Sequence, residues 1–494
     1  MNKIYKVIWS MALNTWVVVS EISSFIKKKS CCLCSGLILV SPFSLGADIE
    51  CLYSSCYADD NIIITTERNL IDEAKQQYPS SRYAALFVGQ KSETNLRVIS
   101  GGKVTASTLQ VGVNNNSVVD IRDGGEIIID DYGQNITSLF NIGQGGEGVV
   151  NIDGAGSVLN FIPGDEEINV GYSSTGYLNI TNGGKFISTP SDSSWGSIYA
   201  GGRGGASGVI KVSGKGSLLE PAYRLYVGVW GDGKLEVTSG GIVNTQNFQM
   251  GYIASGEAIV SGTGSQLNID NTAAIVTTTD INARGTLIVN NGGKVTADTI
   301  VLGSGNFNNP STGVAEVLIG GEDNNIIQEA GILDAGKITF KGKNTSLTLN
   351  HASDNFNLSS DINTEVSYSY FGSINAVHGL TALSGNNSGY TGALNISSPA
   401  RISVTEQNNL GNATISNDGT LSITSQGNWT FSNTMTGLGF LDVNTANNTF
   451  SFQNATNTAG FRGTLMLSDT SFDLNGDNTA ALVYSSLYAG SGSM

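Results

Sequence analysis

The chain has 494 residues, of which only 13% are charged, and 25 Lys and Arg against 41 Asp and Glu give a net charge of −16. An acidic surface repels phosphate, so this balance argues against binding to nucleic acid. Glycine is abundant at 63 residues and proline scarce at 7, which disfavours helical solenoids and collagen, and two His and five Cys leave few soft metal ligands.

The N-terminal 47 residues have the order of a signal peptide. A basic cluster, Lys27–Lys29, precedes an apolar run from Cys31 to Val40, and Leu45-Gly46-Ala47 follows. An apolar core of about ten residues suits Sec export and is too short for a membrane helix of about 20. We predict cleavage between Ala47 and Asp48. Cleavage would remove five Lys and one Glu, which leaves 20 basic and 40 acidic residues and a charge of −20.

The part of the leader before Lys27 is longer than an ordinary basic region. It contains Asn2-Lys3-Ile4-Tyr5-Lys6-Val7-Ile8-Trp9 and Trp16-Val17-Val18-Val19-Ser20-Glu21. Both segments resemble the extended signal peptide region of type V secreted proteins of Gram-negative bacteria. The resemblance implies Sec and the outer-membrane assembly machinery as partners during export. It also implies that the mature chain is displayed at the cell surface or outer membrane, or is secreted.

Two cysteines, Cys51 and Cys56, remain after cleavage, in a predicted N-terminal cap over residues 48–85. A small disulfide loop is favoured over a zinc half-site in the oxidising compartment that export implies. No other Cys is left, and both His lie about 300 residues downstream.

The region 86–369 is built from repeats. In the first motif, apolar residues stand five and three places before a pair of glycines and three places after its first member, as in Leu178-Asn-Ile180-Thr-Asn-Gly183-Gly184-Lys-Phe186. The alternation is typical of a strand with one buried face, and Gly-Gly is expected to supply the positive φ of a corner. The five copies centre on Gly101–Gly102, Gly124–Gly125, Gly183–Gly184, Gly240–Gly241 and Gly292–Gly293.

A second motif, Gly-x-Gly-Ser, intercalates at Gly154–Ser157, Gly214–Ser217 and Gly262–Ser265. With short strands, glycine corners and no helix-period segment after the leader, the repeats predict an all-β fold, a right-handed parallel β-helix. A β-hairpin at each Gly-Gly is the local alternative, and a β-propeller is disfavoured because unit lengths vary. At about 4.8 Å per rung and about 22 residues a rung, the mature chain would form a rod about 100 Å long.

These repeats resemble the passenger repeats of autotransporter surface proteins of the self-associating, diffuse-adherence type, over about residues 86 to 303. Region 370–494 has a looser pattern, with Tyr390-Thr-Gly392-Ala-Leu394 and Phe461-Arg-Gly463-Thr-Leu465 sharing an aromatic-x-Gly order. It resembles the transport-associated repeat of such passengers and is expected to continue the coil. The strand pattern of a translocator barrel is not recognised, so we expect the barrel to be missing from this chain.

No catalytic, cofactor-binding or metal site is predicted. Gly143-Gln-Gly145-Gly-Glu-Gly148 satisfies a dinucleotide pattern, but a strand follows it, so a corner is favoured. The histidines, His351 and His378, lie in polar stretches and are expected to be exposed and unpaired.

Acidic pairs such as Asp59-Asp60 and Asp130-Asp131 lack Ca²⁺-loop spacing, as does the run Asp165-Glu166-Glu167. A pair of carboxylates that the stacking of rungs brings together for glycoside hydrolysis remains an alternative, because spacing along the sequence does not show which residues meet.

The resemblance and the expected rod predict a non-enzymatic adhesin passenger for cell adhesion, autoaggregation or biofilm formation. Its partners would be further copies of itself, or a host protein or glycan, held by contacts spread along a face. The alternatives are a β-helical polysaccharide lyase or hydrolase, which a cluster of Asp with Lys or Arg on one rung face would favour, and a structural stalk.

Overall fold

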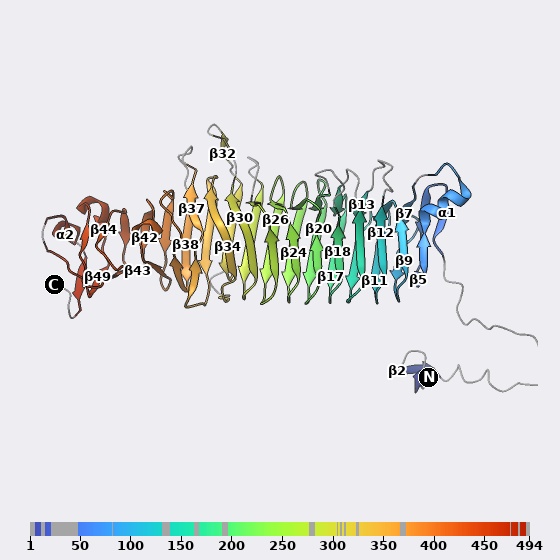
Figure 1. Cartoon of the computed structure of the whole chain (residues 1–494), viewed down its shortest axis with the longest axis horizontal. Coiled ribbons are helices and arrows are strands. Elements are labelled where there is room, and N and C mark those ends of the chain that lie inside the picture. Colours follow the sequence, from blue (N-terminus) through green and yellow to red (C-terminus); the bar gives the residue numbers. More distant parts are fainter. Residues whose placement is uncertain are drawn as a thin grey trace, which may run out of the picture. The chain divides into compact units, whose positions relative to one another are not determined.

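The computed structural model describes most of the chain, and the described residues are 5–10, 15–20, 48–81, 83–130, 139–162, 167–189, 196–275, 282–303, 305–306, 309–310, 313–322, 326–365, 372–474, 476–482 and 485–490. The chain divides into two units, residues 1–46 and 47–494. In the first unit, β1 (Tyr5–Ser10) pairs antiparallel with β2 (Thr15–Ser20). The second unit is a parallel β-helix, which confirms the predicted fold (Figure 1).

Each rung of the helix contributes strands to stacks that run along the rod. The first stack is a 16-stranded parallel sheet. In order along the rod its strands are β5 (Ile62–Ile64), β8 (Thr94–Val98), β11 (Ser117–Arg122), β14 (Gly148–Asp153), β17 (Thr175–Thr181), β20 (Ser207–Ser213), β23 (Asp232–Thr238), β26 (Ser255–Ser261), β29 (Arg284–Asn290), β33 (Val314–Gly320), β35 (Asn344–Asn350), β38 (Ser373–His378), β40 (Ala393–Ile396), β42 (Thr414–Asn417), β45 (Met435–Gly437) and β48 (Gly460–Phe461).

The second stack follows the first in each rung. Its strands are β6 (Glu67–Asn69), β9 (Lys103–Ala106), β12 (Glu126–Asp130), β15 (Val158–Ile162), β18 (Lys185–Ser188), β21 (Leu218–Glu220), β24 (Ile242–Thr245), β27 (Gln266–Ile269) and the first halves of β30 (Lys294–Leu302) and β34 (Ile332–Phe340). A seven-stranded parallel sheet takes this place in later rungs, with β36 (Phe356–Leu358), β39 (Leu380–Leu383), β41 (Arg401–Val404), β43 (Thr420–Thr424), β46 (Phe440–Asn444), β49 (Thr464–Ser468) and β50 (Ser486–Ala489).

The third stack completes the rung. Its strands are β4 (Ser55–Ala58), β7 (Ala85–Val88), β10 (Thr108–Val111), β13 (Phe140–Ile142), β16 (Ile168–Val170), β19 (Ile198–Ala200), β22 (Arg224–Val227), β25 (Asn247–Met250), β28 (Thr272–Ile275), the second halves of β30 and β34, and β37 (Asp361–Thr364), with β44 (Trp429–Phe431) and β47 (Phe450–Phe452) in later rungs. Outside the stacks lie β3 (Glu50–Leu52), β31 (Gly305–Asn306), β32 (Asn309–Pro310), α1 (Leu70–Gln77), α2 (Gly476–Ala481), and two short 3₁₀ turns at Gln407–Asn409 and Ala455–Thr458.

Apolar residues of equivalent strands stack in register inside the rod. Ile121 pairs with Ile152, which pairs with Ile180, and all three are fully buried. Alternate residues of each strand point inward, so the stacks share one continuous hydrophobic cluster from Ile49 to Ala481. Burial of this spine drives the coiling, because a single rung cannot cover its own apolar residues.

The rod is shorter than expected. Sixteen first-stack strands define fifteen intervals, or about 70 Å at about 4.8 Å each. The reason is the length of the rungs, since the register partners Asp120 and Asn151 lie 31 residues apart. Toward the C-terminus, the register partners Asn375 and Asn395 lie only 20 residues apart. The rung length expected from the sequence therefore suits the C-terminal rungs and a few earlier ones, such as the rung from Leu96 to Val119, and is too short for the others.

The helix α1 was not expected from the sequence. The side chain of Asn69 caps it by accepting a hydrogen bond from the Asp72 amide, and Leu70, Ile71 and Ala74 are buried. At the blue end of the rod in Figure 1, α1 lies beside the first rungs, where it contacts β3 and β9. It therefore covers apolar residues that would otherwise face water at the end of the spine.

Candidate functional site

The double-glycine segments form tight turns between first-stack and second-stack strands. In each, the residue before the pair and the first glycine have positive φ angles, for example 52° at Asn182 and 94° at Gly183. The turn closes with a 2.9 Å hydrogen bond from the Gly184 amide to the Thr181 carbonyl. Two successive positive φ angles are the signature of a type I′ turn. The first glycines are Gly101, Gly124, Gly183, Gly240 and Gly292.

The second glycine of each pair does not have a positive φ, unlike the expectation from sequence. A Cβ at Gly184 would lie 2.2 Å from the carbonyl oxygen of Ile152 in the preceding rung. This glycine therefore permits close approach between rungs. The equivalent distances are 2.3 Å at Gly102, 2.0 Å at Gly125, 2.3 Å at Gly241 and 2.3 Å at Gly293.

The serine of the Gly-x-Gly-Ser motif explains why the two motifs alternate. Ser217 is fully buried, and its hydroxyl donates to the Ser213 carbonyl at 2.8 Å. The same hydroxyl accepts from the amide of Gly183, in the double-glycine turn of the preceding rung, at 3.0 Å. Ser157 and Ser265 make the equivalent contacts to the amides of Gly124 and Gly240. The serine thus satisfies an amide that the tight turn leaves without a partner.

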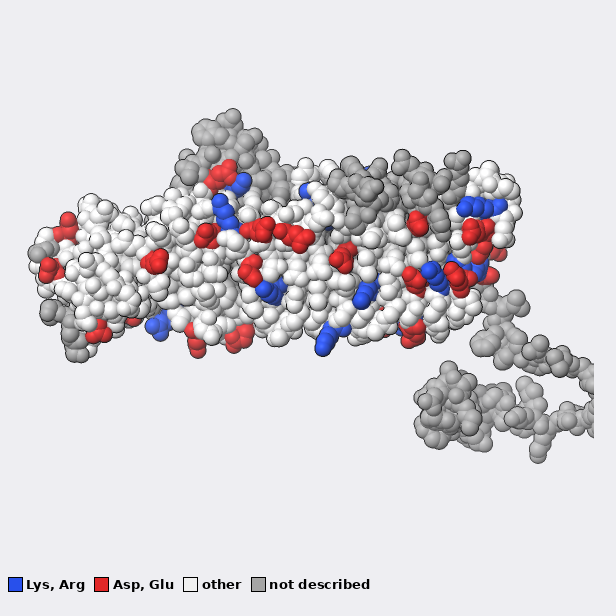
Figure 2. Space-filling view, viewed as in Figure 1, with Lys and Arg blue, Asp and Glu red and all other residues white. Residues whose placement is uncertain are grey.

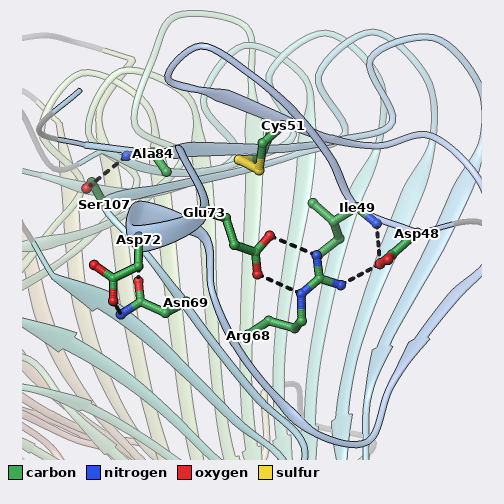
Figure 3. The surroundings of a disulfide bond; sticks show 10 residues. Asp48, Ile49, Cys51, Arg68, Asn69, Asp72, Glu73, Ala84 and Ser107 are labelled. Atoms are coloured by element: carbon green, nitrogen blue, oxygen red, sulfur yellow. Dashed lines mark hydrogen bonds and ion pairs between the residues drawn. A yellow bond between two sulfur atoms is a disulfide. The ribbon is translucent and has the colours of Figure 1, made fainter. Parts of the chain in front are cut away.

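The predicted cysteine pair lies in the predicted N-terminal cap, residues 48–85, whose strands β4, β5 and β6 already belong to the stacks. Cys51 and Cys56 form a disulfide across the antiparallel pair of β3 and β4, with Cα atoms 3.9 Å apart. Figure 3 shows the cysteine above the ion pairs that join β6 to the start of this unit. The bond closes a loop of few residues, so it acts on the cap alone.

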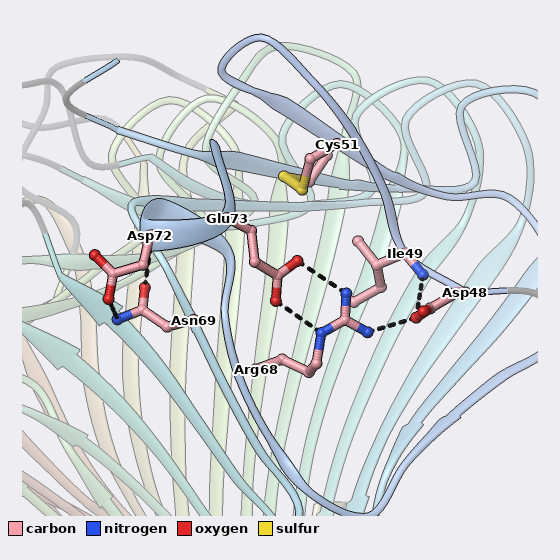
Figure 4. Close-up of polar contacts among 8 residues, drawn as sticks. Asp48, Ile49, Cys51, Arg68, Asn69, Asp72 and Glu73 are labelled. Carbon is pink, nitrogen blue, oxygen red and sulfur yellow. Dashed lines mark hydrogen bonds and ion pairs between the residues drawn. A yellow bond between two sulfur atoms is a disulfide. The ribbon is translucent and has the colours of Figure 1, made fainter. Parts of the chain in front are cut away.

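An arginine fork fastens the start of the cap. Arg68 donates to both carboxylate oxygens of Glu73 on α1, at 2.8 and 2.9 Å, and to the carboxylate of Asp48 (Figure 4). The hydrogen bond to Glu73, followed by the one to Asp48, raises the pKa of Arg68. Asp48 would begin the mature chain if cleavage follows Ala47. That cleavage stays a prediction, since Ala47 lies outside the described residues.

The two histidines lie on neighbouring rungs, and the expectation that they are exposed and unpaired was wrong. His351 is fully buried, and its Nε2 lies 2.9 Å from the hydroxyl of Thr381. Burial lowers its pKa. His378 is half-buried, and its Nδ1 lies 3.0 Å from Oδ1 of Asn350. Both rings therefore belong to cross-rung hydrogen-bond networks.

The acidic segments considered for Ca²⁺ do not converge. Asp59 binds the amide and ammonium groups of Lys91, at 2.8 and 3.3 Å. Asp131, Asp165 and Glu166 lie outside the described residues. Across the described ranges, no group of three or more His, Cys, Asp or Glu is placed to hold a metal ion.

Charged side chains meet on the outer face of the first stack. Asp120 is 4% exposed and lies 3.0 Å from the guanidinium of Arg122 and 3.8 Å from that of Arg97. Asp153 lies on the next rung and accepts a 2.6 Å hydrogen bond from the hydroxyl of Thr181, one rung further on. This hydrogen bond lowers the pKa of the Asp153 carboxyl. The general acid of a glycosidase needs a raised pKa instead, because it must keep its proton near neutral pH.

Aromatic and arginine side chains gather over four successive rungs, which the sequence analysis did not predict. We call this set the aromatic patch, and its members are Tyr172, Tyr199, Arg203, Tyr223, Arg224, Tyr226, Trp230 and Tyr252.

Part of the patch lies on the outer face of the third stack. Tyr199 and Tyr226 are register partners on β19 and β22, and their rings stack 4.5 Å apart at 8°. Arg224 donates to the Tyr226 hydroxyl at 2.6 Å and lies 5.1 Å over the ring of Tyr223. Burial raises the pKa of Tyr199, and the nearby carboxylate of Glu167 adds to this effect.

The rest of the patch lies at the corner between the third and first stacks. Arg203 lies 5.1 Å over the ring of Tyr172, and Trp230 meets Tyr252 edge to face at 5.7 Å. Each corner binds the one before it through its backbone, as in the 3.2 Å bond from the Trp230 amide to the Gly201 carbonyl. Trp230 is 49% exposed, a large value for a residue that is usually well buried.

A shallow depression of about 390 Å³ adjoins this corner on the first stack, beginning two residues after Trp230. Within it, Lys234 lies 3.1 Å from Glu236 and 2.9 Å from Glu257, and the Asp232 carboxylate accepts from the Ser255 amide at 3.2 Å. Its lining is Ser207, Val209, Asp232, Gly233, Lys234, Ser255, Gly256, Glu257, Arg284 and Thr286. The aromatic patch and this depression form the candidate site.

Charged side chains are sparse in this chain, at 13% of its residues. Figure 2 shows a face of the rod that is mostly neither acidic nor basic, with charges in small groups. A ligand on this face would therefore meet mostly uncharged side chains.

Comparison with known proteins identifies the leader. Residues 1–45 match the family model described as the extended signal peptide of the type V secretion system. Over 402 residues the chain is 35% identical to the uncharacterized protein YuaQ of Escherichia coli (strain K12), covering 78% of this chain and 28% of that protein. Over 290 residues it is 31% identical to the uncharacterized lipoprotein YdeK of the same organism, covering 55% of this chain and 21% of that protein.

The chain spans less than a third of the length of these curated relatives. The leader supports the prediction of an autotransporter-type protein, and it implies export through Sec and the outer-membrane machinery to the cell surface or outer-membrane region. None of the described helices is long and apolar enough to cross a membrane.

Proposed function

We propose that the mature chain is an adhesin passenger that mediates adhesion, autoaggregation or biofilm formation at the bacterial surface. The observation that carries this proposal is the aromatic patch, in which a half-exposed Trp230 stands on a rigid corner of an exported rod. Trp, Tyr and Arg are the residues that dominate binding energy at interfaces. A contiguous patch of exposed aromatic side chains commonly marks an interaction site.

The rigidity of the scaffold adds to this argument. Corner residues 203, 230 and 252 sit on backbone that is hydrogen-bonded to the rung before, so binding would order few side chains. Low ordering cost leaves more of the contact energy for affinity. Contacts repeated along a rod also accumulate, so weak single sites can hold two surfaces together.

Cells that display the passenger through a translocator test the proposal against cells that display the translocator alone. We expect faster settling of the culture, or greater retention on host cells or abiotic surfaces, only with the passenger. Equal settling and equal retention in both strains would refute the adhesin function.

One observation favours a second candidate, a polysaccharide lyase or hydrolase. Asp120 between Arg97 and Arg122 is a cluster of the kind that such an enzyme would need on a rung face. However, the Asp120 carboxylate already binds both arginines, so none of the three groups is left to act on a substrate. Depolymerisation of a glycan by the purified protein, abolished in Asp120→Asn, would establish this alternative.

A further inference from the structure

We infer that the aromatic patch and the adjoining depression bind one chain of an uncharged, extended polysaccharide that runs along the rod. The inference rests on the proposed adhesin function and names its ligand class. It starts from the corner rings, because Trp230 and Tyr252 occupy adjacent rungs and Tyr172 lies two rungs before Trp230. Sugar rings have apolar C–H faces that pack against such aromatic faces.

The spacing of the rungs suits a polymer of sugars. Equivalent residues on adjacent rungs are about 4.8 Å apart, which is close to the length of one pyranose unit in an extended chain. A chain laid parallel to the rod axis would therefore offer a similar group to each rung in turn.

The depression supplies the polar half of the site. Asp232 and Glu257 offer carboxylate acceptors and Ser255 a hydroxyl, on the first-stack side of the corner. Carboxylates and hydroxyls arranged beside an apolar platform match the two faces of a sugar ring. The volume of about 390 Å³ is that of a shallow groove, in which the ligand stays partly wet.

The charges in the depression favour a glycan over a protein partner. Lys234 is held by Glu236 and Glu257, and a dry protein interface would have to bury these three charges. That burial would remove the charged groups from water at a cost in free energy, whereas a hydrated sugar chain leaves them in contact with water. The site also contains Arg203, Arg224 and Arg284, but the mature protein would carry a net charge of −20, and this net charge disfavours an anionic polysaccharide.

Binding of the purified exported protein to immobilised polysaccharides tests the inference. The probes are neutral polymers (β-glucan, mannan and galactan) and anionic polymers (hyaluronan and heparin). We expect binding to at least one neutral polymer, weakened at least about tenfold by Trp230→Ala or Tyr252→Ala, as for an interface hot spot. The matched control is Phe440→Ala, because Phe440 is 47% exposed but lies on β46, far along the chain from the patch.

Three outcomes would overturn the inference. They are no binding to any neutral polymer, equal loss in Phe440→Ala, or a preference for the anionic polymers. Circular dichroism of each variant shows whether a loss reflects unfolding, and Trp230→Phe, which keeps a ring, should retain most of the affinity. The adhesin function is judged separately, because cells that still adhere with Trp230→Ala would keep that function and remove only this ligand site.

Discussion

The two glycines of one corner should respond differently to the same substitution. Alanine at position 183 must adopt a φ near 94°, but its Cβ would be 3.4 Å from the nearest atoms of Ala155, an ordinary contact. The left-handed conformation alone costs about 1–2 kcal/mol. We therefore expect Gly183→Ala to lower the free energy of unfolding by about that amount.

Alanine at position 184 meets the neighbouring rung instead. Its Cβ would lie 2.2 Å from the carbonyl oxygen of Ile152, so the rungs must separate by about an ångström to reach ordinary contact. Such a shift would stretch the backbone hydrogen bonds between β14 and β17, each worth about 1 kcal/mol net. Because packing below the corner would be lost as well, we expect Gly184→Ala to lower the free energy of unfolding by about 3–5 kcal/mol.

Urea unfolding, together with hydrogen exchange of peptides over β15 and β18, measures both effects. Local exchange is needed because long repeat arrays can depart from two-state unfolding. Gly427→Ala is the control, since a Cβ at Gly427 meets nothing within 4 Å and its φ is not positive. If Gly184→Ala were no more harmful than Gly183→Ala, close approach between rungs would not be the reason for the second glycine.

Three further outcomes follow from buried contacts. Ser217→Ala should cost about 1–3 kcal/mol in the free energy of unfolding, measured by urea denaturation, because it leaves the Gly183 amide without an acceptor. Replacing Cys51 and Cys56 with Ser should lower the local stability of the cap by about 2 kcal/mol, because the disulfide no longer restricts the unfolded segment. Hydrogen exchange should therefore become faster in the cap and stay unchanged in the rest of the rod. Burial lowers the pKa of His351 in the fold, so its contribution to stability is present above about pH 6.5 and lost as pH falls below it. Urea midpoints from pH 8 to 5 should show this loss in the native protein and a weaker one in His351→Gln.

The sequence predicts the rungs because each double-glycine motif carries its own strand pattern. Leu178 and Ile180 before the turn and Phe186 after it are all buried, as their spacing indicates. The alternation of the two motifs is visible in the sequence, but its cause is not. The hydrogen bond from Gly183 to Ser217 joins residues 34 apart, and only stacking of the rungs shows that they meet.

The aromatic patch could not be predicted for a related reason. Arg203, Trp230 and Tyr252 follow one another at unequal intervals, so no fixed period marks them. A signal does exist once the rungs are known, because each lies one or two residues after a glycine that ends a third-stack strand. The prediction that His351 is exposed was wrong for a different reason. Its neighbours in the sequence are polar and suggested exposure, but β35 and the rungs beside it bury the ring.

Rung lengths vary while the register of the first-stack strands from β11 to β23 does not, and this bears on how a binding surface can be built. The register partners Asp120 and Asn151 lie 31 residues apart, whereas the register partners Ser213 and Thr238 lie 25 residues apart. The inward apolar residues of all four strands are nonetheless fully buried in one column. The extra residues must therefore be taken up between strands. Corner residues such as Trp230 can therefore be substituted without altering the buried column. The corners and outer faces of such a rod then determine its ligand, while the glycine turns and the buried column hold the rungs in place.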